Sequence, residues 1–193
     1  MGAAALRFEA ASVGSEPFYH FALLVPGNRF AAARAWLAAR TPLLARPESE
    51  ETVFAFDAWS ALACYAHDPA GNIVELIAHR GMEESPERGA FGAAELRGLS
   101  ELGIVTPDLV AGLGALHATG LELWYGEVSG QRQGFGFVGR QAHTLILCPP
   151  GRPWLPTARP AEPHPLQTVM DAGEGDGVVV RVDHDGAVDV ARP

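Results

Sequence analysis

The sequence contains no lysine, and all fourteen of its basic residues are arginine. Without an amine side chain, the chain has no residue for Schiff-base chemistry and none for the phosphate-binding lysine of a P-loop. The net charge of −9 and the lack of a basic stripe argue against nucleic acid, whose phosphates demand clustered positive charge. The composition therefore excludes lysine-based catalysis and predicts no nucleic-acid partner.

Cysteine and long apolar runs are scarce as well. Cys64 and Cys148 each lie within an apolar, strand-like stretch, so small buried side chains explain them better than a disulfide or a metal pair. No window of about 18 apolar residues occurs, and the first residues lack the apolar stretch of a secretion signal. The sequence therefore predicts a cytoplasmic protein in a reducing compartment, with no membrane partner.

What is present indicates a folded α+β protein. The 193 residues are 48% hydrophobic and 19% charged, which is ordinary for a globular chain of one domain or two small modules. A strand is expected over residues 18–25, and an amphipathic helix follows it, with Asn28 as its cap and Thr41-Pro42 at its end. Three further strand-like stretches are "TVFAF", "SALACYAH" and "NIVELIAH".

The same order of elements recurs after a charged linker that is rich in glycine and proline. "SELGIVTP" predicts a strand, and Thr106 can cap the next helix with Pro107 at its first position. Three strands, "LELWYGE", "GFGFVG" and "HTLILCPP", complete a second βαβββ unit, which indicates an internal duplication. In the Pro-rich tail, "GVVVRVDHDGAVDV" predicts a hairpin closed by Asp185-Gly186.

The expected organisation therefore has five parts. They are an N-terminal arm over 1–17, a first βαβββ module over 18–80, a linker over 81–98, a second module over 99–150 and a C-terminal extension over 151–193.

Two of these features resemble the vicinal oxygen chelate superfamily, which includes glyoxalase I, extradiol dioxygenases and bleomycin-resistance proteins. One is the strand "HFALLV" followed by a helix, and the other is "YAHDPAGNIVEL", which is similar to the Asp-Pro-x-Gly-Asn-x-x-Glu-Leu ending of a family module. The resemblance implies two paired βαβββ modules whose curved mixed sheets enclose one cavity. It also implies a monomer or homodimer that binds a small molecule.

The resemblance further implies a metal site on the first and last strands of each module. His20, Glu75 and Glu101 match three of the four ligand positions, with Glu75 and Glu101 also available for catalysis. The fourth position falls within 145–147, which is Leu-Ile-Leu, so the sequence departs from the glyoxalase pattern there. One imidazole and two carboxylates suit a divalent ion such as Zn, Mn, Ni or Fe(II).

Glu75 stands out for a physical reason that is independent of any family. Residues alternate between the two faces of a strand, so Glu75 shares its face with Ile73, Ile77 and His79. An unpartnered carboxylate among such neighbours is costly, and it should be paired, protonated or bound to a cation. The residues by themselves leave these three alternatives open.

The expected function is that of a glyoxalase-like enzyme, a divalent-metal-dependent lyase, isomerase or dioxygenase that acts on a small oxygen-rich molecule. The alternative is a metal-free binding protein of the resistance type, in which Glu75 is paired to an arginine or a tyrosine. Candidate cavity-lining residues are His79, Trp124 and Phe137. Arg132 and Arg140 could orient an anionic substrate, although solvated surface positions explain each of them better.

Overall fold

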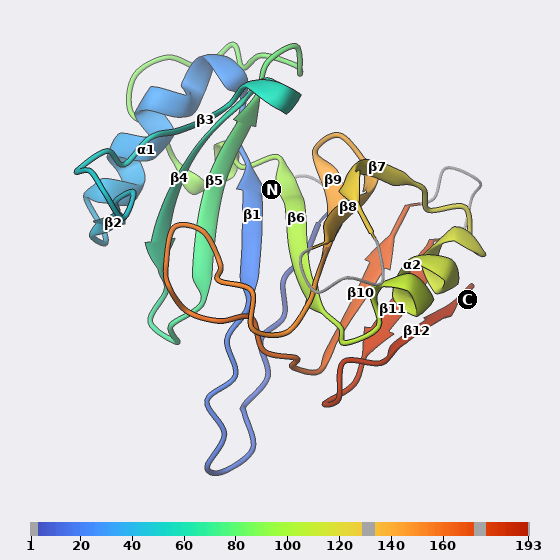
Figure 1. Ribbon diagram of the computed structural model, residues 1–193. Helices are drawn as coiled ribbons and strands as arrows, with labels where there is room; N and C mark the ends of the chain where they lie inside the picture. The colour runs from blue at the N-terminus through green and yellow to red at the C-terminus, as the bar shows by residue number, and fades with distance from the viewer. Residues whose placement is uncertain (1–3, 129–133, 172–176, 193) are drawn as a thin grey trace. The chain divides into compact units, whose positions relative to one another are not determined.

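The computed structural model describes residues 4–128, 134–171 and 177–192 and has an α+β fold, as the sequence predicts (Figure 1). The chain divides into two compact units, residues 1–101 and 102–193. The expected enclosure of one cavity by two modules concerns the placement of these units and stays a prediction. No helix in the described part of the chain is both long and apolar enough to cross a membrane.

The first unit is built on a mixed sheet with one α-helix. Its strands follow the order β2-β4-β5-β1, β3 pairs with β4, and the first half of β6 lies beside β1. β1 and β5 run parallel, whereas β4 is antiparallel to β2, β3 and β5. The elements are β1 (His20–Leu24), α1 (Phe30–Ala38), β2 (Leu43–Leu44), β3 (Phe54–Phe56), β4 (Ala61–His67), β5 (Ile73–His79) and β6 (Gly98–Val105).

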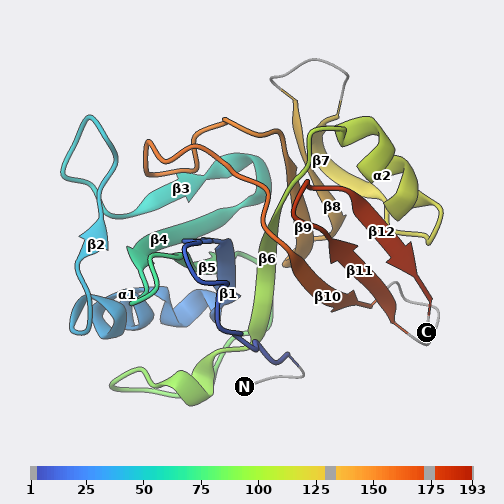
Figure 2. The same ribbon diagram turned by 90° about the horizontal axis from the view of Figure 1, so that it is seen from below.

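One face of this sheet packs on α1 and forms an apolar core (Figure 2). Leu76 of β5 and Cys64 of β4 lie opposite each other in the register and belong to this core, together with Ala33 and Leu37 of the helix. Because strand residues alternate, Glu75 and its neighbours two positions away lie on the other face. The helix therefore fixes the sheet from one side and leaves the Glu75 face uncovered by α1.

The second unit contains two sheets and one α-helix. The second half of β6 is followed in the strand order by β9, β8 and β7, and a separate three-stranded sheet has the order β10-β11-β12. The helix α2 packs against β8, β9 and β12, so the C-terminal strands share a core with the second module. The elements are α2 (Leu109–His117), β7 (Leu123–Glu127), β8 (Phe135–Arg140), β9 (His143–Cys148), β10 (Leu166–Met170), β11 (Val178–Val182) and β12 (Val188–Ala191).

Both helix caps differ from the sequence-based expectation. The side chain of Asn28 makes no cap, because it exchanges two hydrogen bonds with the backbone of Ser85 instead. The cap of α2 is Asp108, whose carboxylate accepts from the Ala111 amide at 2.9 Å, and Thr106 lies two residues too early. In the first case a backbone group 57 residues away binds the Asn28 side chain, and in the second Asp108 takes the role expected of Thr106; spacing alone resolves neither.

The segment that the sequence analysis assigned to a linker is held to the first unit by an ion pair between buried Arg29 and half-buried Glu95. The guanidinium of Arg29 donates to both carboxylate oxygens of Glu95, at 2.7 and 3.1 Å, and to the carbonyl of Gly89 at 3.0 Å. The hydrogen bond from Arg29 lowers the pKa of Glu95. This pair therefore stabilises the fold while Glu95 is ionised.

We expect replacement of this pair to destabilise the first unit in a pH-dependent way. Because the folded pKa of Glu95 is depressed, its contribution is present above the unfolded pKa and is lost as the pH falls through the folded value. In urea unfolding, Arg29→Met should lower the free energy of unfolding strongly at pH 7 and less at pH 3. The exposed pair Arg7–Glu9 provides the control, and Arg7→Met should leave stability unchanged at both pH values.

Candidate functional site

The turn between β4 and β5 sets the position of β1. The Asp68 carboxylate accepts from the amides of Ala70 and Asn72, both at 2.9 Å, and from the Asn72 side chain at 2.7 Å. Gly71 has a φ of +84°, a conformation that glycine adopts without strain. The Asn72 side chain then accepts from the Tyr19 amide at 2.9 Å, one residue before β1 begins. The "DPAGN" motif therefore ties β1 to β5 at the point where His20 enters the sheet.

This register brings His20 and Glu75 into direct contact. His20 lies opposite Ile73 and Ala22 lies opposite Glu75, so His20 and Glu75 are diagonal neighbours on one face. The Nε2 atom of His20 is 3.1 Å from Oε2 of Glu75. The small side chain of Ala22 leaves room for this approach. Both polar side chains are buried, with 6% and 2% of their surface exposed.

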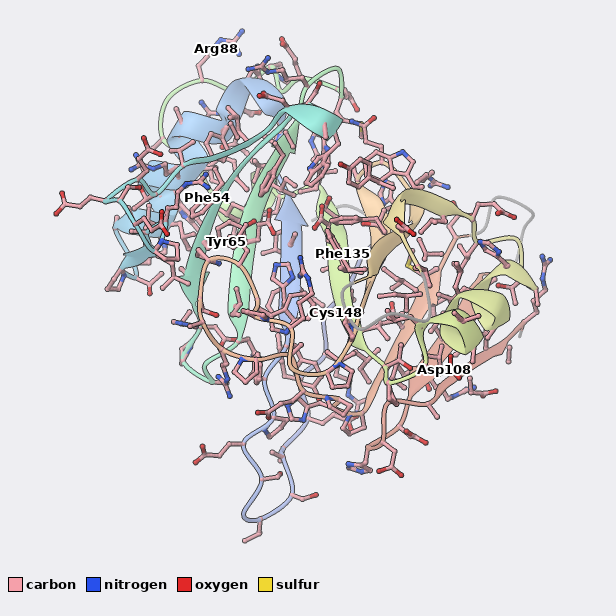
Figure 3. All side chains as sticks on the ribbon, in the orientation of Figure 1. Phe54, Tyr65, Arg88, Asp108, Phe135 and Cys148 are labelled. Carbon is pink, nitrogen blue, oxygen red and sulfur yellow. The ribbon has the colours of Figure 1, made fainter. Side chains whose placement is uncertain are left out.

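Tyr65 is the second partner of Glu75. The two residues lie directly opposite each other on β4 and β5, and the tyrosine hydroxyl donates a hydrogen bond to the carboxyl group. Phe54 contacts the tyrosine ring edge-on, with ring centroids 4.9 Å apart. Both residues are labelled in Figure 3. Burial raises the pKa of Tyr65 well above its usual value, so the hydroxyl keeps its proton and remains a donor.

Glu101 on β6 completes an acidic cluster within the first unit. Its side chain is 5% exposed, and it acts electrostatically on both His20 and Glu75. The preceding residue, Ser100, has its hydroxyl oxygen 3.3 Å from Nε2 of His79, which is also buried. The expected site residues His20, Glu75, Glu101 and His79 therefore lie in one unit.

Desolvation dominates the electrostatics of this cluster. Burial raises the pKa of Glu75 to about 8, although the hydrogen bond from Tyr65 acts to lower it. Burial, followed by the charge of Glu75, raises the pKa of Glu101 to about 8, and burial lowers the pKa of His20 to about 4. Without a further cation, the His20–Glu75 contact is therefore a hydrogen bond between neutral groups at pH 7. Among the described residues, no arginine shifts the pKa of either carboxyl group.

The cluster fits part of a divalent-metal site. Two donors that bind one ion at about 2.1 Å with a right angle between them lie about 3 Å apart, which matches the 3.1 Å between His20 and Glu75. Two ionised carboxylates would also balance the charge of a divalent ion. Within residues 4–128, 134–171 and 177–192, however, no three His, Cys, Asp or Glu side chains are gathered closely enough to hold an ion. Glu101 is thus near the pair without forming a closed site with it.

The remaining sequence-based candidates lie in the second unit. Trp124 and Phe137 contact each other edge-on, with ring centroids 6.4 Å apart. Arg140 is exposed and forms an ion pair with Asp171 at 3.3 Å, whereas Arg132 lies outside the described residues. Sequence reasoning missed Tyr65, although its place four residues into a strand opposite Glu75 follows once the turn at 67–72 is recognised.

Comparisons with known proteins give a limited result. Neither a protein-family model nor a curated protein matches the chain. Crystal structures of two glyoxalase I mutants from Zea mays are similar to it, with 15% and 14% sequence identity and a TM-score of 0.47 each. The matches cover 90% of this chain and 66% and 68% of the maize chains, so the chain spans about two thirds of their length. Likeness at this level assigns neither a family nor an activity.

The buried carboxyl groups predict a distinctive pH dependence for the metal-free protein. Between the unfolded pKa near 4.5 and the folded value of about 8, the folded state binds a proton that the unfolded state releases. The free energy of unfolding should therefore fall as the pH rises through this range in the presence of a chelator. Glu75→Gln should make the free energy of unfolding less dependent on pH. Glu122→Gln, at an exposed position, should leave the pH dependence unchanged. Urea unfolding between pH 5 and 8 measures both, and equal slopes would contradict the assignment.

We also expect Tyr65→Phe to act through Glu75. Loss of the hydroxyl removes the donor that favours the ionised carboxylate, so the pKa of Glu75 should rise further. Stability should fall by about 1–3 kcal/mol, the usual cost of leaving a buried acceptor without its donor. Carbon-detected NMR titration of the Glu75 carboxyl group measures the shift. Tyr125→Phe, in the second unit, serves as the control and should leave this pKa unchanged.

Proposed function

We propose that this protein is a glyoxalase-like enzyme that depends on a divalent metal ion and acts on a small oxygen-rich molecule as a lyase, isomerase or dioxygenase. The single observation that supports the proposal best is the 3.1 Å contact between His20 and Glu75. It lies in a buried acidic cluster that no described arginine compensates. A divalent ion is the natural counter-charge for two such carboxylates.

In this proposal the residues of the first unit have separate roles. His20 and Glu75 hold the ion, Glu101 supplies the third donor, and the Tyr65 hydroxyl orients the carboxyl group of Glu75. When bound, the ion supplies Lewis-acid polarisation of a substrate oxygen. No hydrogen bond or ion pair to another described side chain holds the carboxylate of Glu101. That group is therefore suited to move a proton at a substrate carbon.

A second candidate function is metal-free binding of a small molecule. The hydrogen bond from Tyr65 favours it, because Glu75 then has two protein partners and needs no ion. In this case the buried acid fixes the strands, and ligand affinity comes from other side chains. The two candidates differ in whether metal content depends on His20, Glu75 and Glu101 together.

Metal content decides between the candidates. Protein purified without chelator, and then incubated with Zn, Mn, Ni or Fe(II), should carry close to one ion per chain by plasma mass spectrometry. Glu75→Gln and His20→Ala should lose the ion, and Glu101→Gln should bind it at least tenfold more weakly. Tyr125→Phe is the matched control, because it removes a tyrosine hydroxyl in the second unit and should retain the ion.

The thermal unfolding temperature provides an independent reading of the same experiment. Addition of the preferred ion should raise it for the native chain and for Tyr125→Phe, and should leave it unchanged for Glu75→Gln. A native chain that stays empty with all four ions overturns the enzyme proposal. The Tyr65-paired, metal-free binding protein is then the supported function.

A further inference from the structure

A cluster of four aromatic rings lies on one face of β7 and β8 in the second unit. Tyr125 lies opposite Phe137 in the register, and their ring centroids are 6.1 Å apart. Phe135 contacts Phe137 at 5.7 Å, and Trp124 contacts it at 6.4 Å. Tyr125 is 39% exposed, whereas Phe137 is buried. The cluster therefore has a closed base and an open rim.

A β-bulge creates this arrangement. Leu123 lies opposite Val138, but Tyr125 lies opposite Phe137, so Trp124 is an extra residue on the β7 side. A bulge of this kind re-aims side chains, and here it brings Trp124 and Tyr125 both into contact with Phe137. Gly126 allows the close approach that follows, because a Cβ atom there would lie 2.5 Å from the carbonyl oxygen of Phe135.

The opposite face of the same strands accounts for the hydrophobic core of the unit. Val138, Leu145 and Leu147 are fully buried on that face, and α2 packs against β8 and β9. A Cβ atom added to Gly112 of α2 would contact Leu147. The packing of α2 therefore does not require the aromatic cluster, which lies on the face away from it.

Arg152 places a positive charge on the cluster. Its guanidinium carbon lies 4.0 Å from the centroid of the Phe135 ring, a close cation–π contact. The same guanidinium donates to the thiol sulfur of Cys148 at the end of β9, and both Phe135 and Cys148 are labelled in Figure 3. Two backbone hydrogen bonds at 2.8 Å, between Gly151 and Ala161 and between Ala161 and Arg152, fix the chain at this point.

This guanidinium has no anionic partner among the described residues. Arg152 is half-buried, and no ion pair with a carboxylate forms within 4.0 Å in the described ranges. Glu127, which lies opposite Phe135, is exposed and does not reach it. A pre-positioned arginine with free donors matches the planar geometry of a carboxylate.

We propose that the aromatic cluster and Arg152 form a binding site for a flat aromatic carboxylate. The rings of Trp124 and Tyr125, which pack on Phe137, contact the aromatic body, and the guanidinium of Arg152 donates to the carboxylate. All of these groups belong to the second unit, so the proposal does not depend on a metal ion in the first.

The test compares two isosteric probes that differ in charge. 1-Naphthoate and its neutral analogue 1-naphthamide are titrated by calorimetry into the full chain, with and without a chelator. We expect naphthoate to bind at least tenfold more tightly, with the indole NMR signal of Trp124 shifted by both probes. Trp124→Leu and Tyr125→Leu should weaken both probes by a similar factor.

Variants of Arg152 separate recognition from a structural role. Arg152→Gln should abolish the preference for naphthoate while it leaves naphthamide binding within about twofold, and Arg152→Lys should retain part of the preference. Arg140→Gln is the matched control, because Arg140 is exposed and already paired with Asp171. Arg140→Gln should prefer naphthoate over naphthamide by the same factor as the native chain.

Three results would overturn the proposal. They are equal affinity of the native chain for both probes, no binding of either probe, and an Arg152→Gln variant that weakens both probes equally. The last result means that Arg152 only holds the 151–161 segment to the sheet. Glu75→Gln, which tests the metal proposal, should leave the naphthoate preference unchanged, so failure of one proposal is distinguishable from failure of the other.

Discussion

Burial of Glu75 is the constraint on which the rest of the first unit depends. A carboxyl group that is 2% exposed must be hydrogen-bonded, because desolvation without compensation costs several kcal/mol. Tyr65 on β4 and His20 on β1, the two strands that flank β5, form the hydrogen bonds that offset this cost. One acid thus favours a single register of three strands, because a slip of one strand by one residue would turn its polar group toward the core on α1.

The same constraint links structure to chemistry. The charge of Glu75 raises the pKa of a second acid, Glu101, beyond the effect of burial, and no arginine of the described chain lowers it. A protein gains no stability by burying two carboxyl groups near each other, and perturbed acids of this kind cluster at functional sites. These two acids are therefore the residues on which the proposed function rests, and Glu75 also fixes the strands.

The second unit follows a different plan. Its apolar core is formed by α2 and the inward face of β8 and β9, and the C-terminal strands close the other side of the helix through β12. The opposite face carries the aromatic side chains that the bulge at Trp124 brings together. It also carries the guanidinium of Arg152, at the start of the 151–161 segment. Each unit thus holds charged or ionisable groups that no opposite charge among the described residues neutralises: the acids Glu75 and Glu101 in the first, and the guanidinium of Arg152 in the second.

The sequence by itself determined the α+β class, the alternation that places Glu75 among isoleucines, and the turn at 67–72, because each depends on neighbours along the chain. It did not determine the caps of either helix, because Asn28 binds the backbone of Ser85 instead and Asp108 takes the place of Thr106. Only the tertiary structure decided that Tyr65 donates to Glu75 and that Arg152 lies over Phe135. These contacts join residues on different strands and loops, and their distances depend on register, which local sequence patterns do not encode.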